Sequence, residues 1–358
     1  MSSEARGWTV SSSTDRLALD DLGAELDALL AEVDAPICAR RLWLTVWLRS
    51  HAEFSPWVVS VREHGQLGGV VALAERRRAG HQEIVALGHG SSDYARLPAR
   101  SDAAARALAD AIGDALQRRR WPWRLRLDQL PPADPVAIHL GDRLAHAAFE
   151  PGDAAPRLLL QADRPLDAVM SAKTRQSLRT ARNRLEKLDE GYAVRTERGP
   201  RVCSELDDIE RVHRLRDHAL GRDSDLDDPA RRRFWRDVLS AYGERGEVEV
   251  GRLQIGGELA AYSVSFLDGS SYRLWDTRID PARSFVSPGR VLLADLIERL
   301  RAEGGWSEFD FMRGEEDYKR RMSDDAVLTE SLRAWSSGAL RSLERGFRAM
   351  RGRLRRRA

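Results

Sequence analysis

The chain has 358 residues, of which 42% are hydrophobic and 32% charged, so it can build folded cores and is not a disordered protein. Its length suggests two domains, no apolar run reaches the roughly 18 residues of a membrane-spanning helix, and the polar N-terminus has no signal peptide. The two cysteines, Cys38 and Cys203, exclude a disulfide framework and a zinc site. We therefore expect a cytoplasmic protein.

The net charge of +2 hides two local basic segments. Residues 170–187 hold six lysines and arginines against one glutamate, and residues 339–358 hold eight arginines against one glutamate. Within 170–187, leucine and alanine fall at helical spacing, which leaves the cations on the other faces of a helix. These cations are either solvated or contact an anion, such as the phosphates of CoA, an anionic acceptor or tRNA.

Hydrophobic periodicity and turn residues predict the elements of the first half in chain order. They are helices at 20–33 and 38–50, strands at 57–63, 67–77 and 83–88, a helix at 101–118, a strand at 123–130, a helix at 134–146 and a strand at 157–161. Ser101 is placed to cap the alanine-rich helix.

The second half repeats this order. It is predicted to contain helices at 167–189, 203–220 and 229–243, strands at 248–254, 258–267 and 271–279, a helix at 290–303, and strands at 307–313 and 326–335. The turn at 64–69 also aligns with 256–261, and 127–130 aligns with 309–312. We infer two copies of one α/β domain, each a mixed sheet with helices on both faces.

The turn Ser287-Pro288-Gly289 opens the helix at 290–303. A helix N-terminus after a glycine turn presents free N–H groups and a positive dipole end, which suit a pyrophosphate or a carboxylate. An ordinary helix entry has the same sequence, so the turn alone does not identify a site.

Residues 284–322 combine a Ser-Pro-Gly turn, a helix with Leu-Leu, and the motif Asp-Phe-x-x-Gly-Asp/Glu-x-x-Tyr-Lys. These are Ser287, Pro288, Gly289, Leu292, Leu293, Asp310, Phe311, Gly314, Glu315, Tyr318 and Lys319. The stretch resembles the GNAT (acetyltransferase) superfamily, specifically its cellulose-biosynthesis-type, CelD-like branch, and the resemblance extends more loosely over 165–335. It implies two tandem GNAT-like domains, as in Fem-type aminoacyl-tRNA-dependent peptidyltransferases. We expect domains at 1–162 and 163–336, followed by a C-terminal helix at 337–358.

The resemblance implies that acyl-CoA binds with its pyrophosphate at Ser287, Gly289 and Arg290. The sequence departs from the usual GNAT phosphate loop, because Pro288 lacks a backbone N–H that would otherwise contact phosphate. We expect the charge of Arg290 to compensate. The first copy has no comparable glycine turn before 101–118, so we expect it to have lost donor binding.

Acyl transfer to an amine requires a base, a stabilised oxyanion and a proton for the leaving thiolate. No serine or cysteine nucleophile stands out, so direct transfer is expected. By resemblance, Tyr318 protonates the thiolate; the alternative is a packed tyrosine. Lys319 is a second catalytic candidate, or it forms a salt bridge with Asp310 or Glu315. Asp310 is expected to orient Lys319 or Arg313.

Asp276, on the strand at 271–279, is the expected base for the incoming amine. Asp93 and Tyr94 lie in a loop that we expect to line a cleft between the domains, and we place them with Arg313 in acceptor binding. Each of these positions is also consistent with a solvated polar residue. The eight histidines show no metal-ligand spacing, so no metal cofactor is expected.

The sequence therefore predicts a GNAT-type N-acyltransferase that moves an acyl group from acyl-CoA to an amine, or to a hydroxyl, of a small molecule or glycan precursor. A Fem-like transferase that uses aminoacyl-tRNA and a non-catalytic GNAT-fold scaffold are the alternatives. No nucleic acid other than tRNA is expected as a partner.

The last segment, 337–358, has Leu340, Leu343, Phe347, Met350 and Leu354 on one helical stripe, with arginines on the rest. A basic amphipathic helix of this kind binds an anionic membrane or an acidic partner, or packs on the second domain. The first of these would place the protein at the inner face of the membrane.

Overall fold

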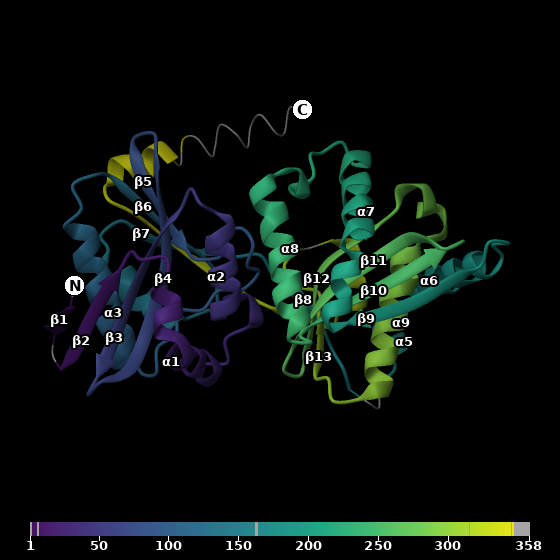
Figure 1. Ribbon diagram of the computed structural model, residues 1–358, viewed down its shortest axis with the longest axis horizontal. Coiled ribbons are helices and arrows are strands. Elements are labelled where there is room, and N and C mark those ends of the chain that lie inside the picture. The colour runs from purple at the N-terminus through teal and green to yellow at the C-terminus, as the bar shows by residue number, and fades with distance from the viewer. Residues whose placement is uncertain (1, 6, 162–163, 315, 345, 347–358) are drawn as a thin grey trace. The chain divides into compact units, whose positions relative to one another are not determined.

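The computed structural model describes residues 2–5, 7–161, 164–314, 316–344 and 346. The chain forms two compact units, Met1–Gly152 together with Leu328–Ala358, and Asp153–Val327 (Figure 1). Among the described residues, no helix is both long enough and apolar enough to cross a membrane.

The first unit is an eight-stranded sheet in the order β1-β2-β3-β4-β5-β6-β15-β7. Its elements are β1 (Ser2–Ala5), β2 (Trp8–Ser13), α1 (Ala18–Glu32), a 3₁₀ turn η1 (Ile37–Ala39), α2 (Arg41–Ser50), β3 (Ser55–Glu63), β4 (Gln66–Arg78), β5 (His81–Ala86), α3 (Asp102–Gln117), β6 (Trp123–Leu130), α4 (Pro135–Arg143), β7 (Ala147–Pro151) and β15 (Glu330–Trp335). Among the described strands of this sheet, β5 and β6 form a parallel pair and the other neighbours are antiparallel. Ser101 caps α3 as expected, accepting a hydrogen bond from the Ala104 N–H at 3.1 Å.

The second unit is a seven-stranded sheet in the order β14-β8-β13-β12-β11-β10-β9. Its elements are β8 (Ala155–Leu159), α5 (Leu166–Val169), α6 (Ala172–Glu186), β9 (Tyr192–Arg198), η2 (Gly199–Glu205), α7 (Leu206–Ala219), η3 (Asp225–Asp227), α8 (Pro229–Glu244), β10 (Val248–Ile255), β11 (Glu258–Asp268), β12 (Ser271–Ile279), η4 (Pro281–Val286), α9 (Pro288–Glu303), β13 (Glu308–Asp310), α10 (Asp317–Met322) and β14 (Asp325–Val327). Here β12 and β13 are the parallel pair.

Helices cover both faces of the second sheet. Leu274 of β12 packs into a core with Leu292 and Ile297 of α9. The ring of the next residue, Trp275, lies against Phe234 and Trp235 of α8. Ala261 of β11 belongs to the same core as α9, while Phe266 of that strand packs against Tyr242 of α8. Since these two strand positions are five residues apart, they point to opposite faces, and α9 and α8 lie on opposite sides of the sheet.

The two units exchange one strand each. β8 follows β7 along the chain but pairs with β13 and β14 of the second sheet, while β15 follows β14 but lies between β6 and β7 of the first. Without β1, the strand order of the first sheet matches that of the second sheet read in reverse. In this common order β15 and β8 occupy equivalent positions. The architecture is therefore two tandem copies of one mixed α/β domain, as the order of predicted elements indicated.

The exchange changes the domain boundaries. The predicted strand at 157–161 was assigned to the first copy, whereas the structure places it, as β8, in the second sheet. The predicted strand at 326–335 was assigned to the second copy, but it divides into β14, which stays in the second sheet, and β15, which joins the first. The units therefore divide at 152/153 and 327/328, in place of 162/163 and 336/337. The pairing partner of a strand is a long-range property, so chain order could not reveal this difference.

The predicted C-terminal helix starts at Gly338 and is described as far as Glu344, with Gly346 also helical. The indole N–H of Trp335 donates to Glu344 at 2.7 Å, which ties the helix to the first unit. Leu343 on the predicted stripe is 61% exposed, and Phe347, Met350 and Leu354 lie outside the described residues.

Asp134 caps α4 from a buried position. Its side chain is 2% exposed and accepts a hydrogen bond from the Ala137 N–H at 3.1 Å. Burial raises the pKa of Asp134 to about 6, against the opposing effects of backbone N–H groups and Arg96. Between about pH 4 and pH 6 the folded chain retains a proton that the unfolded chain loses. Stability therefore falls as pH rises through this window, by up to about 3 kcal/mol.

We expect Asp134→Asn, which keeps a capping oxygen, to raise the melting temperature at pH 8 and to change it little at pH 4. Thermal unfolding at both pH values measures this difference. Asp228→Asn, at the exposed N-cap of α8, is the matched control and should show no such pH-dependent gain. An equal effect of Asp134→Asn at the two pH values would show that the buried charge is not its cause.

Candidate active site

The candidate site lies where β12 and β13 separate. The two strands pair through Ser271–Arg273 and Glu308–Asp310, and β12 then continues to Ile279 without β13. The register of β12 against β11 shifts at Trp275, so that Asp276 lies opposite Val264 and Leu274 opposite Ser265. Such a bulge redirects the side chains that follow it, and bulges are common beside active sites.

The bulge brings Asp276 into a group of polar side chains. Asp276 Oδ2 accepts a hydrogen bond from the Tyr262 hydroxyl at 2.7 Å, and Oδ1 accepts one from Arg278 at 2.8 Å. His213 Nε2 of α7 lies 3.8 Å from Asp276 Oδ2. Asp276 raises the pKa of Arg278 above its ordinary value, so the guanidinium stays charged.

His213 was not selected from the sequence, where histidines were considered as metal ligands alone. Its side chain is 5% exposed, and its Nδ1 lies 2.9 Å from Ser224 Oγ and 3.2 Å from Asp217 Oδ2. Burial alone would raise the pKa of Asp217, but Arg222, Arg278 and His213 together lower it by more. The net shift of this pKa is downward. The spacing of His213 and Asp217, which places both on one face of α7, was the available signal.

Tyr318 lies in the first turn of α10 and packs against Phe311, with 6.4 Å between the ring centres. Its pKa is raised, first by burial and then by Glu316 and Asp276, while Arg278 acts in the opposite direction. The phenol keeps its proton at neutral pH, as a proton donor must.

The contacts of Lys319 stabilise a loop. Its buried ammonium donates to the Arg313 carbonyl and lies 3.1 Å from Glu316, so it holds the loop between β13 and α10. The expected partner Asp310 instead binds Arg273 and accepts a hydrogen bond from the Met312 N–H at 2.7 Å. Glu315 lies outside the described residues. Arg313 Nε lies 3.9 Å from Asp153.

The turn before α9 joins the same region of β12. Ser287 has a left-handed backbone (φ 53°), and Pro288 is the first residue of α9. A Cβ on Gly289 would lie 2.7 Å from the Ile279 side chain, so the glycine permits close packing of α9 on β12. This packing accounts for Gly289 without any ligand.

Arg290 supplies a positive charge at the start of α9. Its guanidinium donates to the Ser177 hydroxyl of α6 and forms no ion pair with a described residue. Burial and the neighbouring Arg321 lower the pKa of Arg290. A partly buried guanidinium with no carboxylate partner among the described residues is stabilised by a bound anion.

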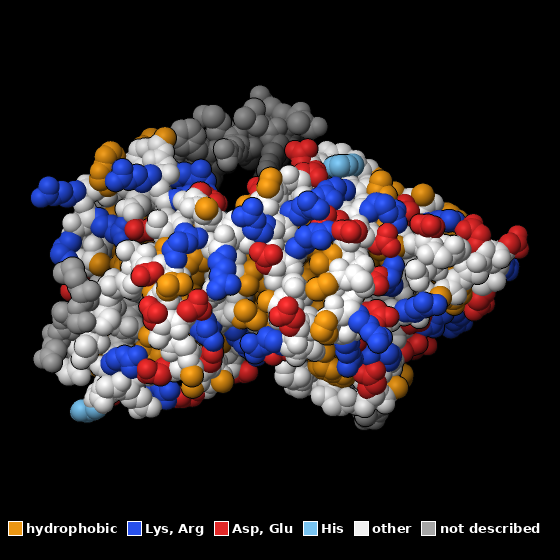
Figure 2. Space-filling model, viewed as in Figure 1, with side chains coloured by type: hydrophobic (Ala, Val, Ile, Leu, Met, Phe, Trp, Pro, Cys, Tyr) orange, Lys and Arg blue, Asp and Glu red, His pale blue; other side chains and the backbone are white. Residues whose placement is uncertain are grey.

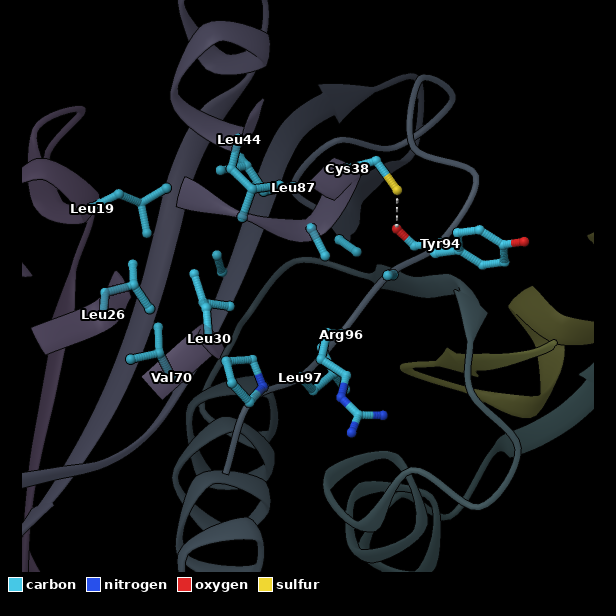
Figure 3. A pocket seen from close by; sticks show the side chains of 15 residues that line it. Leu19, Leu26, Leu30, Cys38, Leu44, Val70, Leu87, Tyr94, Arg96 and Leu97 are labelled. Atoms are coloured by element: carbon cyan, nitrogen blue, oxygen red, sulfur yellow. Dashed lines mark hydrogen bonds between the residues drawn. The ribbon is translucent and has the colours of Figure 1, made fainter. Parts of the chain in front are cut away.

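Asp93 and Tyr94 belong to the first unit, so the structure does not group them with Tyr318. The Tyr94 carbonyl accepts a hydrogen bond from the Cys38 thiol at 3.3 Å, and Tyr94 lines an apolar pocket with Leu19, Leu26 and Leu30. Its ring points away from these leucines (Figure 3). A role of Asp93 and Tyr94 in a cleft between the domains stays a prediction.

Residues 172–320 match the model of the family described as acetyltransferase (GNAT) domain. A search of curated proteins gave no match. FemX is similar in structure, with a TM-score of 0.62 and 10% identity over 88% of this chain and 97% of that one. The C-terminal domain of an Agrobacterium fabrum protein named as a lysylphosphatidylglycerol synthetase has a TM-score of 0.56 and 11% identity, over 92% and 95% of the two chains.

A Bacteroides thetaiotaomicron protein of unknown function is also similar, with a TM-score of 0.54 and 12% identity over 90% of this chain and 99% of that one. These likenesses establish the fold, and none of them distinguishes a branch of the superfamily, so the CelD-like assignment stays a prediction. Residues 172–320 therefore match a GNAT acetyltransferase domain, and they lie in the second of two units that share one sheet order.

Proposed function

We propose that the second unit transfers an acyl group from acyl-CoA directly to an amine of a small molecule or glycan precursor. The observation that carries this proposal is the Asp276 carboxylate, which Tyr262 and Arg278 hold at the end of β12 that β13 leaves unpaired, together with the protonated phenol of Tyr318 on α10, the helix that follows β13. A protonated phenol, a carboxylate and free strand edge groups are together the components that acyl transfer requires.

In the proposed reaction the amine nitrogen attacks the thioester carbonyl carbon and the carbon–sulfur bond breaks. The amine loses one proton, and the departing thiolate gains one from the Tyr318 hydroxyl, so the reaction is balanced in protons. Asp276 receives the amine proton, with His213 placed 3.8 Å away to pass it on. Tyr262 and Arg278 hold the carboxylate in position.

Arg290, at the start of α9, is the proposed contact for the CoA phosphates. We expect Arg290→Ala to weaken CoA binding by about 10- to 100-fold, because a charge-assisted hydrogen bond is worth roughly 1.5–3 kcal/mol. Calorimetric titration with CoA measures the change.

Arg283→Ala is the matched control, since Arg283 lies in η4 but is already paired with Glu190 at 3.0 Å. It should bind CoA as the unaltered protein does. Equal affinity of the Arg290→Ala variant, or no CoA binding by the unaltered protein at millimolar concentration, would refute this placement.

Transfer from an aminoacyl-tRNA is a second candidate. The sequence resemblance to Fem-type aminoacyl-tRNA-dependent transferases implies this donor, and α6 presents several cations that tRNA phosphates could contact. Incubation with an acyl-CoA panel and with charged tRNA, each with an amine panel and mass spectrometry of the products, separates the two donors. Product from charged tRNA alone would replace acyl-CoA as the donor.

A further inference from the structure

Three segments of the first unit meet at one end of its sheet. The β4–β5 hairpin turns at Arg78 and His81, and the Gln82 N–H donates to the Pro122 carbonyl at 2.8 Å, which places the turn between α3 and β6 beside it. The Ser336 N–H donates to the Trp123 carbonyl at 2.9 Å, so the start of the C-terminal helix lies at the same end.

This end carries an excess of positive charge. Arg77, Arg118 and Arg120 are exposed and form no ion pair with a described residue. The carboxylates close by are already neutralised. Glu83 contacts Arg76, Arg78 and Arg124, Glu75 contacts Arg119, and Glu344 contacts Arg124.

Two large apolar side chains lie among these arginines. Trp121 is 65% exposed in the turn before β6, and Leu343 of the C-terminal helix is 61% exposed. Figure 2 shows basic and hydrophobic side chains together at this end of the unit, the upper end of β5 and β6 in Figure 1. We name Arg77, Arg118, Arg120, Trp121 and Leu343 the Trp121 surface.

We propose that the Trp121 surface docks the protein onto an anionic phospholipid bilayer. Tryptophan prefers the membrane–water interface, where its ring meets the acyl chains and its N–H stays hydrated. Arginines beside it gain about 1 kcal/mol each from an anionic lipid surface. An RNA would also attract the arginines, but Leu343 cannot stack on bases, so a lipid surface satisfies the whole patch and RNA only part of it.

This inference is independent of the proposed acyl transfer, since its residues all belong to the first unit. The test is cosedimentation of the full chain with vesicles of phosphatidylcholine containing 30% phosphatidylglycerol, against vesicles of phosphatidylcholine alone. We expect binding to the anionic vesicles and a loss of about thirtyfold in partition for the double variant Arg118→Ser with Arg120→Ser. Trp121→Ser should also weaken binding.

Matched controls come from exposed residues of the second unit. The double variant Arg201→Ser with Arg233→Ser removes the same charge, and Leu220→Ala removes an apolar side chain that is 51% exposed. Both should bind as the unaltered chain does, and melting temperatures show whether every variant is folded. Binding that survives in the Trp121→Ser and arginine variants would overturn the proposal. Absence of binding to the anionic vesicles would also overturn the proposal, even if the chain binds RNA in a mobility-shift assay.

Discussion

Tyr318→Phe should lower turnover by about 10²- to 10⁴-fold, the usual contribution of a positioned general acid. The substitution removes one oxygen and keeps the ring that packs against Phe311, so the melting temperature should not change. Steady-state release of free CoA thiol measures the rate. Because burial raises the pKa of Tyr318, the phenol stays protonated at ordinary pH, and we expect no loss of rate from its ionisation below about pH 10.

The partner variant is Asp276→Asn, which keeps the shape and removes the charge. We expect a similar loss of rate, and the double variant should lose less than the product of the two single effects, because both groups serve one proton-transfer step. Lys319→Met is the structural comparison. It should lower the melting temperature, since a buried ammonium that binds Glu316 and a carbonyl is removed. A Tyr318→Phe variant with full rate would remove Tyr318 from the mechanism.

Ending the chain after Val327 should unfold the first unit while the second stays folded. The truncation removes β15, whose Leu332 and Ala334 are fully buried between β6 and β7. Burial of one leucine is worth about 1.5–3 kcal/mol, and both neighbouring strands would also lose their hydrogen-bonded partner. Such losses are comparable with the whole stability of a domain, roughly 5–15 kcal/mol.

Hydrogen exchange followed by mass spectrometry can read the two units separately. Peptides of β3 to β6 should lose protection in the chain 1–327, and peptides of β10 to β12 should keep it. The chain 1–346, which retains β15, is the control and should match the full chain. Addition of a synthetic peptide of residues 328–346 should restore protection. Full protection of β6 in the chain 1–327 would show that the exchanged strand is not needed.

Most of the order of elements was predictable because those helices and strands have local signals, but the strands β1, β2, β7 and β9 were not predicted. The Ser101 cap, the leucine-rich α9 and the paired hairpins at 64–69 and 256–261 were all read from neighbouring residues. The sheet that each exchanged strand joins was not predictable, because the residue pattern of β8 and of β15 is the same whichever sheet the strand joins. Their assignment depends on contacts far apart in the sequence, such as Leu332 between β6 and β7.

The candidate site shows the same division. Asp276 and Tyr318 were selected from a strand and a family motif, and the structure places both in the second unit, on β12 and α10. His213 comes from α7, far from the motif, and its link to Asp276 depends on the bulge at Trp275. Lys319 was selected as a catalytic candidate because lysine is rare in this arginine-rich chain. In the structure its contacts hold the loop between β13 and α10.

The most direct test of the account is mass spectrometry of an amine panel incubated with acetyl-CoA and longer acyl-CoA donors, with free thiol measured in the same reaction. The account predicts one acylated amine, formed in equal amount to the CoA released, and strongly reduced product with Tyr318→Phe. Absence of an acylated amine with every donor, or product that forms equally well with Tyr318→Phe, would contradict it.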